Sequence, residues 1–343
     1  MRKLGADIQM RRLPAEFEEQ SFIQVVFPHK KSDWSDYLEE AEKNFIDIIN
    51  AISKYQQCLV VCDDISSVQA HFTSHTNIRF VEVPTNDTWA RDSSVITVYE
   101  DDEPLLLDFT FTAWGGKFDA SLDNEMSSRL ASFYDTPMKR VDFILEGGAI
   151  ESNGKGTLLI TSECVFNPNR NAKLSREESL NILKEEFGVS NIVSLEHGYL
   201  SGDDTDSHID TLARFVDDET IVYLRCEDET DEHFTELKKM EEELKKLKDQ
   251  DGKAFKLVPL PFTRAIYDED DRLPATYANF LIVNKAVLVP VYNDSKDQEA
   301  LKTLQEVFPS RKVVPVDCST LIRQHGSLHC VTMQFPQKVS LRK

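Results

Sequence analysis

Few side chains can carry out covalent catalysis, and this sequence places two of them together near its C-terminus, in the stretch QHGSLHCVTMQFP. Cys330 is a candidate nucleophile, and a cysteine nucleophile needs a basic partner. The alternating pattern from Leu328 to Phe335 predicts a β-strand. Since neighbouring side chains on a strand point to opposite faces, His329 is not expected to be that partner. The alternative for Cys330 is one more buried thiol, a common fate of cysteine.

Candidate partners for Cys330 stand at the start of strand-rich segments elsewhere in the chain. NDTWARDSS contains Asp92, ILEGGAIE contains Glu146, and GDDTDSHID contains His208 and Asp210. The last two would share a face if the backbone is extended there. Each residue alone has an ordinary explanation, such as capping a turn or forming a surface ion pair. Together they indicate a catalytic site.

One thiol, one imidazole and three carboxylates suit a cationic substrate. Acyl transfer would need hydrogen-bond donors for an oxyanion instead. A guanidinium group is planar, permanently charged and matched to carboxylates, and a thiolate can attack its central carbon. His208 would protonate the departing ammonia and then activate water to hydrolyse the thiouronium on Cys330, which leaves a ureido group. The sequence therefore predicts His208 as the partner of Cys330.

The oxygen-rich motif GDDTDSHID also raises the question of a metal site. It departs from the EF-hand pattern, because the sixth position counted from Asp204 is Ile209 and the twelfth is Phe215, where glycine and glutamate are required. A transition-metal site of histidine and carboxylates remains an alternative. We expect no metal here.

The composition of the chain limits the classes of partner that it can bind. Sixty acidic against 39 basic residues give a net charge of −21, which disfavours nucleic acid and anionic membranes and would attract a small cation. The same acidity can simply keep a protein soluble. The N-terminal residues have no signal-peptide core, and the longest apolar stretch, NFLIVNKAVLVPVY, is too short and too polar to span a bilayer. With six cysteines in no paired spacing, we expect a soluble cytoplasmic protein with reduced thiols.

The elements that would position the candidate residues form a repeat. Four segments run from a polar head through a strand and a short turn into a second strand: RDSSVITVYEDDEPLLLDF, EGGAIESNGKGTLLIT, HIDTLARFVDDETIVYLR and YANFLIVNKAVLVPVY. A fifth strand is expected to begin at Cys330 without a partner downstream, and the early strand from Ser21 to Pro28 has none upstream. Pairing these two strands would remove a sheet edge. The five heads are Asp92, Glu146, His208, Asn279 and Cys330.

Helical patterns lie between the strand pairs, over residues 33–55, 175–188, 231–252 and 297–309. The second has Ser175 as N-cap with Glu178 three residues later. Strand pairs separated by helices predict an α/β fold of about five units that close into a propeller-like ring, with the polar heads at its axis. No linker interrupts the chain, so we expect a single domain over residues 1–343.

Six motifs resemble those of the agmatine deiminase family, which belongs to the guanidine-modifying superfamily with arginine deiminases, peptidylarginine deiminases and amidinotransferases. They are TNDTWARD, LEGGAIESNGKGTLLIT, NPNRN, GDDTDSHIDTLARF, LPATYANF and LHCVTMQFP. The resemblance implies a five-bladed α/β propeller (pentein). It also implies hydrolysis of agmatine to N-carbamoylputrescine and ammonia without a cofactor, a step of putrescine biosynthesis. Residues 1–9 precede the similarity, so we expect them to be a flexible extension, with Met10 as an alternative start.

The resemblance also implies a role for each site residue. Cys330 would be the nucleophile and His208 the general acid and base. The remaining roles are Asp92 and Asp210 clamping the guanidinium, Glu146 supporting the substrate or His208, and Trp89 and Asp206 contributing to substrate binding.

Some positions depart from the family pattern, and other functions remain open. Ser93 and Ser94 follow Asp92 where Gly-Pro is usual, and Ser207 replaces a glycine, which bears on the shape of the pocket. The alternatives are a deiminase of free or peptidyl arginine, an amidinotransferase, and an acidic binding protein with a relict site. A homodimer is also compatible with the sequence.

Overall fold

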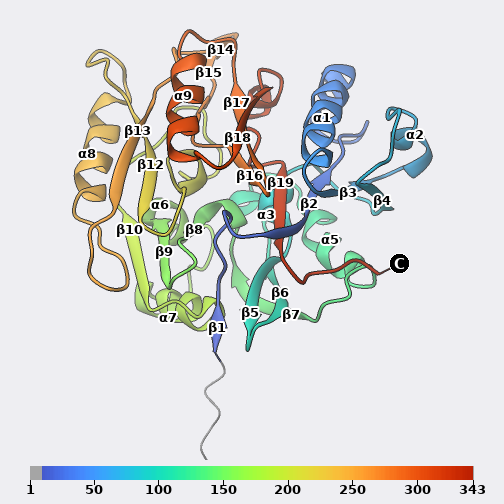
Figure 1. The fold of residues 1–343 in the computed structure, drawn as a ribbon, viewed down its shortest axis with the longest axis horizontal. Coiled ribbons are helices and arrows are strands. Elements are labelled where there is room, and N and C mark those ends of the chain that lie inside the picture. Colours follow the sequence, from blue (N-terminus) through green and yellow to red (C-terminus); the bar gives the residue numbers. More distant parts are fainter. Residues whose placement is uncertain (1–9, 343) are drawn as a thin grey trace, which may run out of the picture.

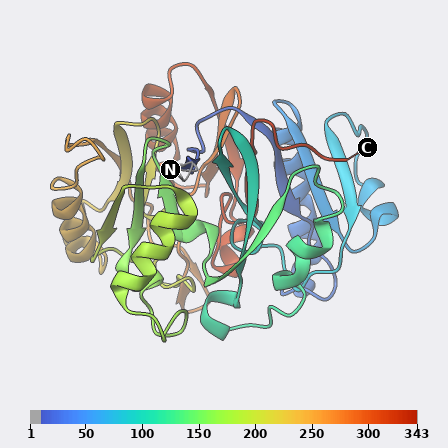
Figure 2. The ribbon, with the colours of Figure 1, turned by 90° about the horizontal axis from the view of Figure 1, so that it is seen from below.

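The computed structural model describes residues 10–342, so the expected extension over residues 1–9 lies outside the described part. The chain builds small sheets with helices toward the periphery of the molecule (Figures 1 and 2). This arrangement confirms the predicted α/β class. Within the described residues, no helix combines the length and apolar composition that crossing a bilayer requires.

Four sheets share one plan, in which an antiparallel strand pair is joined by a third, parallel strand. Their strands are β5 (Ile96–Glu100), β6 (Glu103–Thr110) and β7 (Met138–Ile144); β8 (Ile150–Ser152), β9 (Thr157–Thr161) and β10 (Asn191–Leu195); β11 (Ala213–Phe215), β12 (Thr220–Arg225) and β13 (Lys256–Pro261); and β16 (Leu281–Val283), β17 (Ala286–Val291) and β18 (Lys312–Asp317). β1 (Arg11–Arg12) adds to β5, and β14 (Tyr267–Asp268) pairs with β15 (Asp271–Arg272). The four predicted hairpins are confirmed.

A further sheet follows the same plan with strands from both ends of the chain. β19 (Thr332–Pro336) pairs antiparallel with β2 (Gln20–Val26), and β3 (Gln57–Cys62) and β4 (Ile78–Glu82) follow in parallel. In Figures 1 and 2 the red C-terminal strand lies beside the dark blue β2. The rings of Phe22 and Phe335, which face each other across this pair, stack with centroids 4.3 Å apart. The predicted pairing of the first and last strands is confirmed.

The predicted start of the last strand at Cys330 is wrong, because residues 328–331 form a turn. The side-chain Oδ1 of Asn279 accepts hydrogen bonds from the main-chain N–H groups of His329 (2.8 Å) and Cys330 (3.3 Å). Donors occupied in this way cannot join a sheet ladder. The turn separates the two side chains, as the strand interpretation also required, but by a different geometry.

The four predicted helices are present, together with others that the sequence analysis did not identify. The helices are α1 (Leu38–Ser53), α2 (Ile65–Gln69), α5 (Asp123–Leu130), α7 (Arg176–Phe187), α8 (Phe234–Leu244) and α9 (Asp297–Val307), with the one-turn helices α3 (Ala90–Ser93), α4 (Ala113–Gly116) and α6 (Ser162–Val165). α7 has the predicted Ser175 capping box. α8 ends at Leu244, earlier than predicted, because the chain then turns back to form a bridge between Lys248 and Ala254.

The polar heads meet because each sheet begins with a turn at the same end of its first strand. These turns include α3 and the 3-10 helices η2 (Gly147–Ala149) and η3 (Ile209–Thr211). The N–H of Arg91 donates to the carbonyl of Cys330 (3.1 Å), and the N–H of Gly148 donates to Asp92 Oδ1 (2.9 Å). His208 and Asp210 lie at a 3-10 turn, so the condition of an extended backbone, under which they would share a face, is not met.

Gly188 is the C-cap of α7 and packs closely against Arg11 of β1. It adopts a left-handed conformation (φ +63°), and a Cβ added there would lie 1.9 Å from the carbonyl oxygen of Arg11. Gly252 has a similar φ (+79°) with nothing within 4 Å of an added Cβ. We expect Gly252→Ala to lower the free energy of unfolding by about 1–2 kcal/mol, the cost of the left-handed backbone alone. Gly188→Ala should lower it further, because the backbone at Arg11 must also shift. Equal effects in urea denaturation would contradict this packing.

Candidate active site

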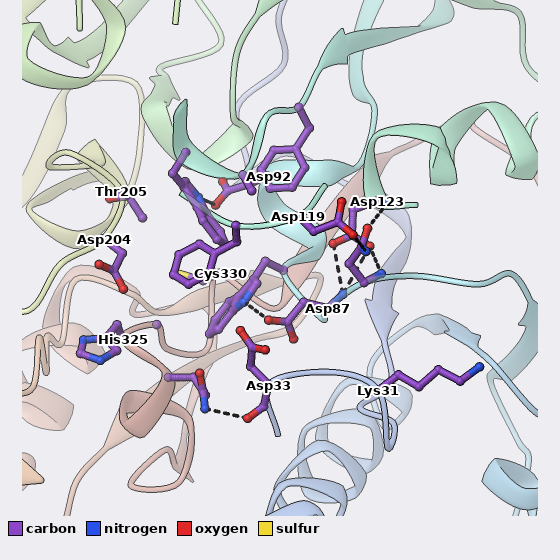
Figure 3. Close-up of a pocket in the computed structure, with 18 residues that line it drawn as sticks. Lys31, Asp33, Asp87, Asp92, Asp119, Asp123, Asp204, Thr205, His325 and Cys330 are labelled. Atoms are coloured by element: carbon purple, nitrogen blue, oxygen red, sulfur yellow. Dashed lines mark hydrogen bonds between the residues drawn. The ribbon is translucent and has the colours of Figure 1, made fainter. Parts of the chain in front are cut away.

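A cavity of about 440 Å³ opens where the heads meet. Cys330, Asp92 and Trp89 line it, as the sequence analysis predicted for a pocket around the thiol. Figure 3 shows Cys330 and Asp92 together, while other aspartates surround a different part of the same cavity. Its acidic residues are Asp33, Asp87, Asp92, Asp119, Asp123 and Asp204.

Cys330 is almost fully buried, and its thiol donates a hydrogen bond to Asn279 Oδ1 (3.4 Å). Burial, together with the negative charges of Asp210 and Asp92, raises the pKa of Cys330 well above its ordinary value. Nearby carboxylates disfavour a second negative charge on sulfur. The free protein therefore holds a neutral thiol at neutral pH.

His208 lies between two carboxylates. Its Nδ1 is 3.7 Å from Asp92 Oδ1 and its Nε2 is 3.6 Å from Glu146 Oε2, and neither buried ring nitrogen makes a hydrogen bond. Burial alone would lower the pKa of His208, but the neighbouring negative charges, Asp92 foremost, raise it well above its ordinary value. The imidazole is therefore protonated at neutral pH and can act as a proton donor.

Glu146 is held in its ionised form by cations behind the site. Arg170 Nε donates to both carboxylate oxygens at 3.2 and 3.1 Å. Burial would raise the pKa of Glu146, but His208 and Arg170 together lower it. The arrangement fits the predicted support of His208 by Glu146.

Asp92 and Asp210 present carboxylates from two different heads. Asp92 accepts from Trp114 Nε1 (3.0 Å) and from the Gly148 N–H (2.9 Å). Asp210 is fully buried, and its Oδ1 has no partner. A Cβ added to Gly148 would lie within 2.6–3.1 Å of His208 Nδ1, Asp92 Oδ1 and Asp210 Oδ2. Gly148, the second glycine of LEGGAIE, therefore leaves the space in which the three side chains converge.

His329 has a role that the sequence analysis missed. Its ring nitrogens lie 2.7 Å from Asp210 Oδ2 and 2.6 Å from Glu16 Oε2, and Glu16 Oε2 also accepts from Arg214 Nη2 (2.9 Å). The imidazole thus bridges the two carboxylates, one at each ring nitrogen. His329 therefore holds Asp210 in position and keeps its pKa low despite burial. The position of His329 next to Cys330 was the sequence feature that could have indicated this role. No sequence feature indicated the role of Glu16.

Two predicted substrate-binding residues differ in their placement. Trp89 lines the cavity, and its Nε1 donates to Asp87 Oδ2 (3.0 Å). Asp206 is not among the lining residues; its carboxylate pairs with Arg170 and with Lys117. It therefore positions Arg170, which holds Glu146. The predicted contact of Asp206 with substrate stays a prediction.

No arginine of the described part of the chain lines the cavity. Arg91 and Arg214 are buried near Glu16, Arg170 is buried behind Glu146, and Arg264 pairs with Asp294 elsewhere. The one lysine of the lining, Lys31, lies away from Cys330 in Figure 3. The cavity thus offers no arginine partner for a substrate carboxylate.

Two buried clusters have the composition of a metal site. Glu16, Glu151 and His329 form one, but both ring nitrogens of His329 are hydrogen-bonded and Arg214 occupies the two carboxylates. Glu146, Cys164 and His208 form the other, in which the imidazole is free of hydrogen bonds.

Residues 12–336 match the model of the Porphyromonas-type peptidyl-arginine deiminase family. The chain belongs to this family. A Porphyromonas gingivalis structure described provisionally as an arginine deiminase is 49% identical, with a TM-score of 0.93 over 96% of this chain and 99% of that one. A Cys-to-Ser agmatine deiminase from C. jejuni with substrate bound is 42% identical, with a TM-score of 0.92 over 97% and 98%. A Mycoplasma capricolum protein provisionally named agmatine deiminase is 30% identical over 94% of this chain and 95% of its own length. These members confirm the resemblance to agmatine deiminases that the motifs indicated.

The contact of His329 with Glu16 and Asp210 should contribute strongly to stability. His329→Leu leaves two buried carboxylates without this donor and should lower the free energy of unfolding by about 3–5 kcal/mol, the usual cost of breaking a buried ion pair. His329→Gln keeps amide donors and should cost less. Leucine at the exposed His75 provides a surface control. Urea denaturation in which His329→Leu behaves like His75→Leu would contradict the assigned network.

Proposed function

We propose that this protein hydrolyses agmatine to N-carbamoylputrescine and ammonia through a covalent intermediate on Cys330. One observation carries the proposal: the Cys330 thiol and the Asp92 carboxylate line a cavity whose other charged lining is almost entirely acidic, and His208 and Asp210 meet Asp92 around Gly148. Membership in a deiminase family supports the same chemistry. The five similar sheets of the described chain are consistent with a five-bladed propeller, which we propose as their arrangement.

The guanidinium of the substrate would bind between Asp92 and Asp210. Asp210 Oδ1 is buried without a partner, and a guanidinium N–H would satisfy it. Asp92 is held by Trp114 and Gly148, so its carboxylate is already oriented. Two fixed carboxylates on a planar cation give both charge pairing and orientation, which brings the central carbon to the sulfur.

The arriving cation would activate the thiol. A positive charge beside Cys330 offsets the carboxylates that keep it protonated, so the thiolate becomes accessible. The thiol gives its proton to solvent as its sulfur bonds to the guanidinium carbon, and the protonated His208 gives its proton to one amino group, which leaves as ammonia. A thiouronium remains on Cys330, and His208 is neutral.

The second half of the reaction would restore the enzyme. Neutral His208 takes a proton from a water molecule as its oxygen attacks the thiouronium carbon. The carbon–sulfur bond then breaks, the carbonyl of the ureido product forms, and the thiol of Cys330 recovers its proton. The net change is one water consumed for one ammonia released, which requires no cofactor.

The acidic lining favours agmatine over arginine. Agmatine carries a second positive charge and no carboxylate, so the aspartates around the outer cavity attract its distal amine. Arginine would bring a carboxylate among these aspartates without an arginine to pair with it. A penalty of about 3 kcal/mol corresponds to roughly a hundredfold preference. The product would serve putrescine synthesis.

The covalent step can be tested on the thiols. Cys330→Ala and Cys330→Ser should remove essentially all ammonia release, because no nucleophile remains, while circular dichroism stays unchanged. Cys318→Ser, which alters a buried thiol outside the cavity lining, serves as control. Acid quenching of wild-type protein during turnover should trap an adduct on the peptide that carries Cys330. An adduct on Cys318 instead would refute the assignment.

The choice of substrate can be tested with a panel of guanidines. We expect kcat/KM for agmatine to exceed that for free arginine by about two orders of magnitude, from the penalty given above. Ammonia release and product mass would be measured for agmatine, arginine and a peptidyl arginine. Citrulline formation from arginine at a comparable rate would overturn the substrate while leaving the deiminase chemistry in place.

The pH dependence should reveal the distal binding site. Burial raises the pKa of both Asp87 and Asp123 to about 7, so both are largely neutral at pH 6 and ionised at pH 8. The preference for agmatine over butylguanidine, which lacks the distal amine, should therefore increase from pH 6 to pH 8. Asp87→Asn should weaken this increase. A ratio of kcat/KM values that stays constant with pH would exclude these aspartates from amine binding.

A further inference from the structure

A second thiol lies beside His208 and takes no part in the proposed reaction. Cys164, on the one-turn helix α6 that follows β9, is buried, and its Sγ is 3.9 Å from Glu146 Oε2. One ligand atom each from Cys164, Glu146 and His208 all lie within 4.8 Å of one another. The structure thus brings a thiol, an imidazole and a carboxylate together away from the cavity lining.

These three groups match the ligand types of zinc. Bonds of about 2.3 Å to sulfur, 2.0–2.1 Å to nitrogen and 2.0–2.2 Å to oxygen place tetrahedral ligand atoms roughly 3.3–3.6 Å apart. His208 Nε2 and Glu146 Oε2 are already 3.6 Å apart. Both ring nitrogens of the fully buried His208 lack hydrogen-bond partners, so one lone pair is available once the imidazole loses its proton. Modest side-chain movement would complete a three-ligand site.

Metal binding needs the thiolate form of Cys164 and a free lone pair on the imidazole, so it would release protons from the cluster.

Arg170 is a cation next to this cluster and could oppose a metal ion. It donates to both oxygens of Glu146, and a carboxylate has enough lone pairs to accept from an arginine and bind a metal together. Asp206 balances the charge of Arg170 from the other side. The ligands therefore remain available.

We propose that Cys164, His208 and Glu146 bind one zinc ion, and that this binding inhibits the enzyme reversibly. Inhibition, but not binding, rests on the proposed function, because the metal occupies the imidazole that the reaction needs for proton transfer. The ion would enter through the cavity past Asp92, the route that a guanidinium must also take to reach His208. His208 also lies 3.7 Å from Asp92, so a metal ion on the imidazole and a guanidinium at Asp92 would repel each other and compete.

Cobalt provides a direct readout of thiolate ligation, because Co²⁺ bound to a thiolate gains a ligand-to-metal charge-transfer band. The experiment uses metal-free Cys330→Ala protein, in which the proposed nucleophile cannot contribute sulfur. One equivalent of Co²⁺ should produce the band, and Zn²⁺ should displace it. The band should be absent from the Cys330→Ala/Cys164→Ser double variant, which keeps the side-chain size.

The outcome of each cobalt titration tests whether Cys164 is a metal ligand. A band that survives in the double variant, a band seen in wild type but absent from Cys330→Ala, or no band at all would each overturn the proposal. Cys226→Ser in the same background alters a thiol outside the cluster and should keep the band. Unchanged thermal midpoints verify folding of every variant.

Activity then tests the inhibitory consequence. Zinc should inhibit wild-type agmatine hydrolysis, and excess agmatine or a chelator should relieve it. Cys164→Ser should retain turnover but require at least about tenfold more zinc for half inhibition, the effect of losing about 1.4 kcal/mol of binding. Equal zinc sensitivity of both proteins would refute Cys164 as ligand. Absence of turnover without zinc would instead refute the proposed function, and the cobalt result would still stand.

Discussion

The candidate active site depends on the hydrogen bonds and ion pairs that the buried carboxylate of Glu16 makes. Glu16 lies in the segment between β1 and β2, yet it accepts hydrogen bonds from the N–H of Ile282, from Arg214 on β11 and from His329. His329 in turn holds Asp210. Four distant parts of the chain therefore share one buried ionic network. Because a buried charge without its partner is costly, these segments are fixed relative to one another only as a set.

The electrostatics around Cys330 are the reverse of those in most cysteine enzymes. Such enzymes place a positive charge beside the sulfur and hold a thiolate in advance. Here burial and the two carboxylates keep the sulfur protonated, and the positive charge of His208 lies between Asp92 and Glu146. In the proposed mechanism the missing positive charge arrives with the substrate. The same field that selects a cation therefore keeps the thiol unreactive until that cation is bound.

Close approach of the backbone makes this arrangement possible. Asn279 Oδ1 accepts from the main-chain N–H groups of His329 and Cys330 and from the thiol, so one amide oxygen shapes the turn that carries Cys330. Gly148 leaves the space in which His208 and the two carboxylates converge. Both features are local, but each acts between segments that the fold brings together.

The sequence by itself determined the strand hairpins and helices, and it indicated the residue types of the site. Turn residues flanked by β-branched strands specify each hairpin, and the capping box and Gly188 specify α7, because these signals act between residues close in the chain. The type and recurrence of Cys330, His208 and the carboxylates likewise indicated a site for a cation.

Only the tertiary structure decided how those residues are held. Glu16 and His329 are 313 positions apart, and nothing local to either one predicts their contact. The ion pair of Asp206 with Arg170 was not predicted for the same reason. The last strand begins later than its alternation predicted, because Asn279 from another sheet binds the donors of Cys330 and its neighbour. Hydrogen bonds between distant segments override local patterns, since a buried donor must be satisfied wherever its acceptor lies.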